Sequence, residues 1–227
     1  MTLGSVLTGP YEQTDVRLDY ERDPSAIYRQ SFETVRREAE LEHFVPNQRP
    51  LITRLVHACG MVEIADRIAI SPRAVELGQK ALKDGAPVLC DCEMVRSGII
   101  RRQLPAQNEI ICTLNEPGTR GLAEHLSTTR SAAAVDLWHD KIDGAVVAIG
   151  NAPTALFHLL ERLDAGWPKP AVILAFPVGF VGAAESKAEL VRDNRGCDFV
   201  ALTGRQGGSA LASAAVNALA SGLDTTP

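Results

Sequence analysis

Helical spacing of apolar residues marks the first part of the chain. Apolar side chains recur three and four positions apart over residues 27–39, behind an Asp23-Pro24 pair that is typical of a helix start. The same spacing runs over residues 47–59. A third stretch covers residues 71–85 and closes at Gly85, where glycine can take the left-handed conformation that ends a helix. We therefore predict a helical N-terminal section.

From residue 87 onward the pattern changes to short β-rich runs, each followed by a helical stretch. The five runs are Val88–Cys90, Glu109–Thr113, Ala145–Ile149, Ala171–Phe176 and Phe199–Leu202. The last three are almost wholly apolar, as expected of strands that are buried on both faces. These alternations predict an α/β fold in which a mostly parallel sheet carries helices on both faces.

No internal repeat and no linker divides the chain. Residues 1–22 lack periodicity and are interpreted as an N-terminal tail without chemistry, and residues 23–222 as a single α/β domain. The most apolar window, residues 171–184, is shorter than the roughly 20 residues that span a bilayer, which argues against a membrane helix. The first basic residue is Arg17, so the charged start of a signal peptide is not seen and a cytoplasmic location is expected.

Charge and cysteine content narrow the function classes. Lys and Arg total 23 against 28 Asp and Glu, which gives a net charge of −5 and argues against binding to nucleic acid or an anionic membrane. The five cysteines are scattered and odd in number, so we predict reduced thiols. The only close pair, Cys90 and Cys92, lacks the spacing of a zinc site, and buried small residues are the favoured interpretation. No metal site is expected.

Glycine-rich loops follow three of the predicted strands, where open parallel sheets bind ligands. They cover residues 150–154, 177–182 and 204–209. Exposed backbone N–H groups next to a helix start suit an anion. The Walker and GxGxxG patterns of nucleotide sites do not occur in these loops, so nucleotide binding is disfavoured. One such loop alone is equally well explained as a tight turn, but three on one rim favour a large anionic ligand.

Two polar side chains stand apart from the apolar face of the second helix. That face runs from Ile52 to Cys59, whereas Arg54 and His57 lie opposite it and three residues apart. A solvent-exposed pair is the simpler explanation. The alternative is a functional imidazole that the neighbouring cation keeps neutral, and thus able to accept a proton near pH 7.

Arg130 and Ser31 lie on helix faces that are otherwise apolar. Arg130 follows a threonine N-cap and precedes Ala134, Leu137 and Trp138 at helical spacing, which predicts a side chain that points inward to a carboxylate. Its stem could instead carry the guanidinium to the surface. Ser31 would either bond back to a carbonyl of its own helix, the usual outcome, or meet a ligand.

Five segments taken together resemble precorrin-8X methylmutase. They are Ala26–Phe32, Arg54–Gly60, Thr129–Ala134, Gly150–Ala155 and Pro177–Lys187, with Gly85–Pro87 and Gly207–Ala210 also fitting. No single segment is diagnostic, but all fall in the family's order between about Tyr20 and Ala220. The resemblance implies a homodimeric isomerase of cobalamin biosynthesis that needs no cofactor. It would move a methyl group from carbon 11 to carbon 12 of precorrin-8X and yield hydrogenobyrinate.

The resemblance also assigns roles to individual residues. The catalytic histidine of the family falls on His57. The residues expected to bind a tetrapyrrole with carboxylate arms are Tyr28, Ser31, Arg54, Arg130, Asn151, Gly179, Gly207 and Ser209. A 1,5-sigmatropic methyl shift needs the right tautomer rather than a nucleophile or a metal. An imidazole that donates a proton and later recovers one can supply that tautomer.

Three alternatives stay open on the sequence. The substrate could be the cobalt-bound form of the anaerobic pathway, because enzymes of both pathways share these motifs. A non-catalytic carrier of corrinoid precursors would share the binding rim but would not need His57. A cysteine-dependent hydrolase ranks last, because Cys59 points about 200° away from His57 around the helix.

Overall fold

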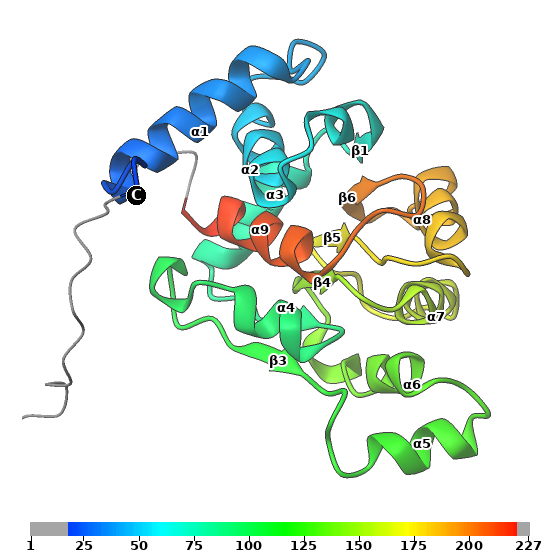
Figure 1. Ribbon diagram of the computed structural model, residues 1–227. Helices are drawn as coiled ribbons and strands as arrows, with labels where there is room; N and C mark the ends of the chain where they lie inside the picture. The colour runs from blue at the N-terminus through cyan, green and yellow to red at the C-terminus, as the bar shows by residue number, and fades with distance from the viewer. Residues whose placement is uncertain (1–17, 222–227) are drawn as a thin grey trace, which may run out of the picture.

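The computed structural model describes residues 18–221 (Figure 1), so most of the predicted tail lies outside the described residues. The helices are α1 (Pro24–Glu38), α2 (Arg49–Cys59), α3 (Ala74–Lys83), α4 (Glu93–Gly98), α5 (Thr119–His125), α6 (Arg130–Asp136), α7 (Pro153–Asp164), α8 (Ala183–Arg192) and α9 (Ser209–Ala220). The strands are β1 (Ile68–Ile70), β2 (Val88–Cys90), β3 (Ile110–Cys112), β4 (Val146–Ile149), β5 (Val172–Ala175) and β6 (Asp198–Leu202). Short 3₁₀ turns cover Val62–Arg67, Arg101–Gln103 and His139–Lys141.

The strands form one six-stranded sheet in the order β1-β6-β5-β4-β2-β3. Every neighbouring pair is parallel except β1 and β6, which run antiparallel with Ile68 opposite Leu202. The five predicted strands and the mostly parallel sheet are confirmed. Strand β1 was not predicted, because it lies between two helices in the section of the chain that was expected to be helical.

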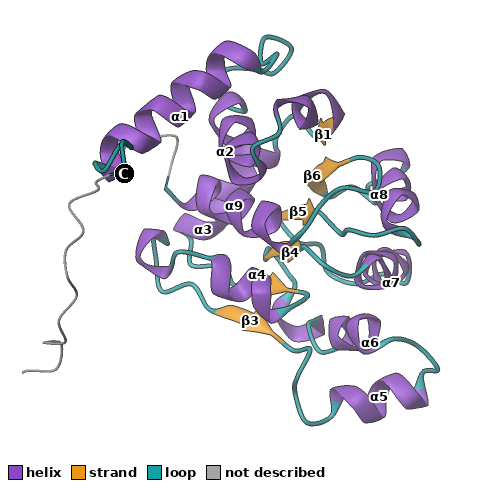
Figure 2. Ribbon diagram, viewed as in Figure 1, coloured by secondary structure: helices purple, strands orange, loops and turns teal. Residues whose placement is uncertain are grey.

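Both faces of the sheet are buried, as the apolar runs predict. Along β4, Val146 and Ala148 belong to one apolar cluster and Val147 and Ile149 to the other, since successive side chains of a strand point to opposite faces. Helices α3, α4 and α9 contribute to the first cluster, and α6, α7 and α8 to the second. Figure 2 shows these two sets of helices on opposite sides of the strands.

Of the three helices of the predicted N-terminal section, α3 packs on the sheet, whereas α1 and α2 lie further out. Helix α2 packs on α9, and α1 packs on α2 further from the sheet (Figure 1). Helix α1 starts as predicted, with the Asp23 carboxylate accepting hydrogen bonds from the N–H groups of Ser25 and Ala26. Helix α2 ends at Gly60, whose φ of 69° is left-handed. The middle of α1 lies against the C-terminal end of α2, where Ser31 contacts His57.

Two further expectations are met by the described residues. All five cysteines are free thiols, as predicted. Burial raises the pKa of Cys112 and of Cys197 to about 11, so neither is a ready nucleophile. Within residues 18–221, no helix has both the length and the apolar character needed to cross a bilayer.

Candidate active site

His57 is held between the two N-terminal helices. Its Nδ1 atom lies 2.7 Å from the Oγ atom of Ser31 on α1. The ring of Phe32 meets the imidazole edge-on with 5.1 Å between ring centroids, and the Tyr28 ring lies 5.4 Å away. One hydrogen bond and two aromatic neighbours thus fix the orientation of the imidazole.

This arrangement decides two questions that the sequence left open. Ser31 bonds to His57, and not to a carbonyl of its own helix as is usual for such a residue. His57 is half-buried rather than fully exposed, because α1 covers the side of α2 that faces away from the sheet. The off-face position of His57 is therefore explained by a second helix that packs there.

The imidazole of His57 favours its neutral form. Its pKa is lowered from the ordinary value of 6.5, first by burial and then by the positive charge of Arg54. The Nε2 atom has no hydrogen-bond partner within residues 18–221, so it is free to exchange a proton with a ligand. This matches the neutral imidazole expected beside a cation.

A cavity of about 470 Å³ opens beside His57. Its wall combines polar groups and apolar side chains: Glu21, Ile27, Gln30, Ser31, Thr34, Val35, Glu38, Val56, His57, Gly60 and Val62. Glu21 belongs to the stretch that the sequence analysis interpreted as a tail without chemistry. The place of Glu21 in the cavity wall could not be inferred from the sequence, because residues 1–22 show no periodic pattern.

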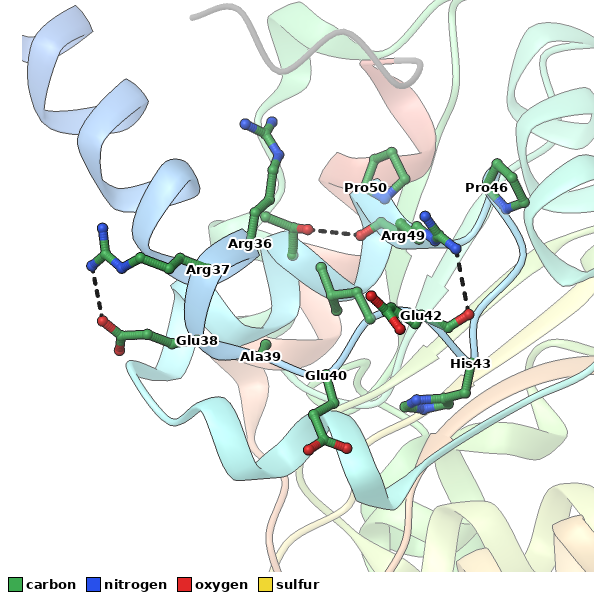
Figure 3. A pocket seen from close by; sticks show the side chains of 12 residues that line it. Arg36, Arg37, Glu38, Ala39, Glu40, Glu42, His43, Pro46, Arg49 and Pro50 are labelled. Carbon is green, nitrogen blue, oxygen red and sulfur yellow. Dashed lines mark hydrogen bonds and ion pairs between the residues drawn. The ribbon is translucent and has the colours of Figure 1, made fainter.

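A larger cavity, about 960 Å³, lies at the other end of the same two helices (Figure 3). Its wall is mostly charged, and several of these charges are already engaged. Arg37 pairs with Glu38 at 3.0 Å, and Arg49 donates to the backbone carbonyls of Phe44 and Glu42. Among the described residues that line this cavity, no histidine is hydrogen-bonded to a hydroxyl as His57 is to Ser31, so the chemistry favours the smaller cavity as the candidate site.

The loop after β4 does not offer the free backbone donors that the sequence analysis expected. The N–H groups of Gly150, Asn151 and Ala152 all donate to the buried carboxylate of Asp91, at 2.8 to 2.9 Å. Asp91 therefore occupies the anion position at the start of α7. What the loop presents to a ligand is the exposed side chain of Asn151.

The loops after β5 and β6 are joined to each other. The Gly208 N–H donates to the carbonyl of Phe176 at 2.8 Å, and the Gly179 N–H donates to that of Arg205 at 3.2 Å. A side chain on Gly207 would collide with the carbonyl oxygens of Phe176 and Pro177, so only glycine fits there. Gly179 and Gly207 therefore belong to one junction, as predicted for one rim.

Contacts connect this rim to the histidine site. The Val178 N–H reaches the carbonyl of Asn151 at 3.3 Å, which ties the loop after β4 to the loop after β5. The side-chain amide of Gln206 lies 3.9 Å from the Sδ atom of Met61. Met61 is flanked by Gly60 and Val62, which both line the cavity beside His57. Ser209 lies at the start of α9 with its hydroxyl 3.4 Å from the Cys92 thiol.

Arg130 departs from the expectation of an inward side chain. It is exposed, and within residues 18–221 it forms no ion pair with a carboxylate. Because it is the first residue of the seven-residue helix α6, its side chain extends past the helix end. Ala134 and Trp138 are buried as predicted, whereas Leu137, which was predicted on the same face, is 43% exposed because it follows the last residue of α6. Figure 1 shows α2 and α6 apart from each other, and their buried side chains belong to the apolar clusters on opposite faces of the sheet, so Arg130 and His57 are carried by helices that do not adjoin within one chain.

Two buried charged residues at the rim escaped the sequence analysis. Asp91 is only 1 % exposed and Lys187 is fully buried. The signal for Lys187 was present, because it lies in line with Ala183 and Leu190 on the buried face of α8, where a cation is unusual. Asp91 directly follows a buried strand, which is the usual place for a functional residue in such a fold.

Comparison with known proteins gives a consistent result. The family model described as CbiC, precorrin-8X methylmutase, matches residues 26–222. A precorrin-8X methylmutase of Pseudomonas aeruginosa is 57% identical over 203 residues, which are 89% of this chain and 98% of that protein. A precorrin-8X methylmutase of Sinorhizobium is 54% identical, covering 89% of this chain and 96% of the relative. The crystal structure of precorrin-8x methyl mutase from Thermus thermophilus superimposes with a TM-score of 0.76 at 36% identity, over 86% of this chain and 95% of that one.

The fold and the site define an α/β protein with a helix-borne, oriented histidine suited to proton transfer on a ligand. The family match and the two relatives above 50% identity go further. The chain belongs to the precorrin-8X methylmutase family, the methyl-shifting isomerases of cobalamin biosynthesis.

We predict that Arg54→Met raises the pKa of His57 only partly toward its ordinary value. Removing the guanidinium cancels the smaller of the two causes of the lowered pKa, whereas burial, the larger cause, stays. NMR titration of the imidazole measures this pKa directly. Arg29→Met is the matched control, because Arg29 is exposed on α1 and is not among the groups that shift the pKa of His57. An unchanged pKa in Arg54→Met would contradict the electrostatic account.

Proposed function

We propose that the protein moves the methyl group of metal-free precorrin-8X from carbon 11 to carbon 12 and releases hydrogenobyrinate, with His57 as the proton-transferring group. The observation that carries this proposal is the Ser31–His57 hydrogen bond on the wall of the cavity between α1 and α2. The metal-free substrate is favoured by identity. The two relatives named precorrin-8X methylmutase are 57% and 54% identical, whereas five named cobalt-precorrin-8 methylmutase are 29% to 36% identical.

The proton transfer has a physical sequence that fits the site. In the free protein the lowered pKa keeps His57 neutral. A substrate that carries several carboxylates raises this pKa when it binds, because negative charge favours the imidazolium. The Nε2–H of that imidazolium then protonates the macrocycle. Protonation favours the tautomer from which the methyl group migrates. Afterwards the Nε2 atom recovers the proton from the macrocycle. Such acid–base assistance is worth roughly 10² to 10⁴ in rate.

Ser31 suits this cycle because a hydroxyl both donates and accepts hydrogen bonds. It donates to Nδ1 while His57 is neutral with its proton on Nε2, and it accepts from Nδ1–H when the ring becomes an imidazolium. The imidazole thus keeps one orientation in both protonation states. Tyr28 and Phe32 restrict the ring further.

The carboxylate arms of the substrate are proposed to bind the arginines. Within residues 18–221 neither Arg54 nor Arg130 forms an ion pair with a protein carboxylate. A guanidinium binds a carboxylate through two parallel hydrogen bonds, which fixes the orientation of an arm as well as holding it. Tyr28, Asn151, Gly179, Gly207 and Ser209 complete the proposed contacts along the rim.

We also propose that the protein is a cytoplasmic homodimer. The resemblance to the family supports the dimer, and two observations on the chain agree with it. Phe180 and Val181 are 84 % and 88 % exposed, which is unusual for neighbouring large apolar side chains. Arg130 and His57 are carried by helices that do not adjoin within one chain, and a second copy resolves this if each site combines His57 of one chain with Arg130 of the partner subunit. The five free cysteines fit a reducing compartment.

We predict that His57→Ala lowers turnover of precorrin-8X by about 10² or more, while hydrogenobyrinate still binds. The alanine removes the proton donor but none of the arginines. The absorption spectrum follows conversion, and a titration with hydrogenobyrinate measures binding. His125→Ala, an exposed histidine on α5, is the matched control and keeps full activity.

Other outcomes of this experiment separate the alternatives. Turnover of His57→Ala within about threefold of the wild type would contradict the role of His57. A wild-type protein that binds hydrogenobyrinate but converts nothing would be a carrier. Conversion of cobalt-precorrin-8 in preference to precorrin-8X would contradict the metal-free substrate.

We predict that mixed dimers of His57→Ala and Arg130→Met regain activity. If each site uses His57 of one chain and Arg130 of the partner subunit, a mixed dimer has one intact site and one doubly altered site. Random exchange of equal amounts then restores about a quarter of wild-type activity. Each variant alone is the control. No recovery after exchange, or a monomer by light scattering at micromolar concentration, would contradict the shared site.

A further inference from the structure

Lys187 is a buried cation that the proposed chemistry has not used. It lies on α8 and is fully buried, and its Nζ atom donates to the carbonyl of Pro177 at 2.9 Å and to that of Gln206 at 2.5 Å. Pro177 belongs to the loop after β5 and Gln206 to the loop after β6. A single buried ammonium group therefore joins the two loops through a hydrogen bond to each.

No carboxylate neutralises this charge. Within residues 18–221 neither Lys187 nor its neighbour Arg67 forms an ion pair with an acidic side chain, and Arg67 instead contacts the side chain of Gln206. Two positive charges thus lie under one loop junction. Burying an ammonium without a counter-ion costs stability, and an apolar residue would fill the same space at a lower cost. The charge therefore calls for an explanation beyond packing.

Backbone geometry shows what the ammonium does to the loop surface. The Gln206 carbonyl and the Gly207 N–H belong to one trans peptide, so they point in opposite directions. With the carbonyl held by Lys187 below, the Gly207 N–H is directed away from it. None of the hydrogen bonds among the described residues uses that N–H. Arg205, two residues before Gly207, is held by the hydrogen bond from the Gly179 N–H to its carbonyl. Its exposed guanidinium lies 5.6 Å from the centroid of the Phe180 ring.

We propose that Lys187 is a positioning residue of the substrate site: it locks the loop after β5 to the loop after β6 and so presents the Gly207 N–H and the Arg205 guanidinium to a carboxylate arm of the tetrapyrrole. The positive charges of Lys187 and Arg67 add long-range attraction for that arm. The inference rests on the proposed function, because it takes the anionic ligand from there. It adds Lys187, Arg67 and Arg205 to the residues that determine binding.

The protonation of Lys187 agrees with this role. Burial, and then the charge of Arg67, lower its pKa to about 8. Most of the side chain is therefore still an ammonium at pH 7, with the donors that both carbonyls require.

Lys187→Met tests the proposal, because methionine keeps the length of the stem and removes the charge and the donors. Hydrogenobyrinate is the probe. We expect its Kd to rise about tenfold and KM to rise with it, while kcat stays within about threefold, since the lost contacts act equally on bound substrate and transition state. Hydrogen exchange of residues 177–182 and 204–208 should become faster. Leu190→Ala is the control, because Leu190 is buried one turn further along α8 and contacts neither loop carbonyl; it should lose stability but keep its Kd.

Each result decides the proposal. Faster hydrogen exchange with an unchanged Kd in Lys187→Met would mean that Lys187 only stabilises the loops, which contradicts the proposal. An equal loss of affinity in Leu190→Ala would mean that general destabilisation causes the effect, which also contradicts it. If the wild-type protein does not bind hydrogenobyrinate, the proposed function is contradicted, and the positioning role of Lys187, which rests on it, is contradicted as well. If Lys187→Met does not fold, Lys187→Gln replaces it, because glutamine also removes the charge while its amide can still donate to one of the two carbonyls. A rise in Kd supports the proposal, and an unchanged Kd contradicts it.

Discussion

Burial of the central strands on both faces is the constraint from which the site follows. Strands β4 and β5 are apolar at every position, so helices must cover the sheet on both sides. Helix α9 does so on one face and is itself almost entirely buried, which leaves it an apolar outer side. Helix α2 packs there, and α1 packs on α2. His57 lies in this third layer, where a ring can be held firmly and still reach a ligand.

Two buried charged side chains, Asp91 and Lys187, hold the loops that follow β4, β5 and β6. Asp91 gathers three N–H groups of one loop, and Lys187 gathers two carbonyls of two others. Neither is paired with an opposite charge among the described residues. Their cost in desolvation is offset by loops that hold one conformation before the ligand arrives, which reduces the entropy lost on binding. The arginines that have no acidic partner among the described residues are the groups proposed to attract an anionic substrate.

Local pattern was enough to predict the elements, and partly enough to predict the site. Alternating strands and helices, the start of α1 at Asp23 and the position of His57 away from the apolar face of α2 could all be inferred, because each depends on residues close in sequence. Strand β1 was missed because it lies within the section of the chain that was predicted to be helical. The positions of Lys187 and Asp91 carried a signal in the sequence, but their contacts could not be inferred, because the partners of Lys187 lie 10 and 19 residues away and those of Asp91 lie 59 to 61 residues away. The inward direction expected for Arg130 was wrong because a helix end does not confine a long side chain.

We propose that ligand binding protonates the His57 imidazole, which is neutral in the free protein. Nitrogen NMR of His57 at pH 7, with and without hydrogenobyrinate, measures this directly. The account predicts one protonated ring nitrogen in the free protein and two in the complex, since the carboxylates of the ligand raise the pKa of His57. A ring that stays neutral in the complex, or that is already an imidazolium in the free protein, would contradict it.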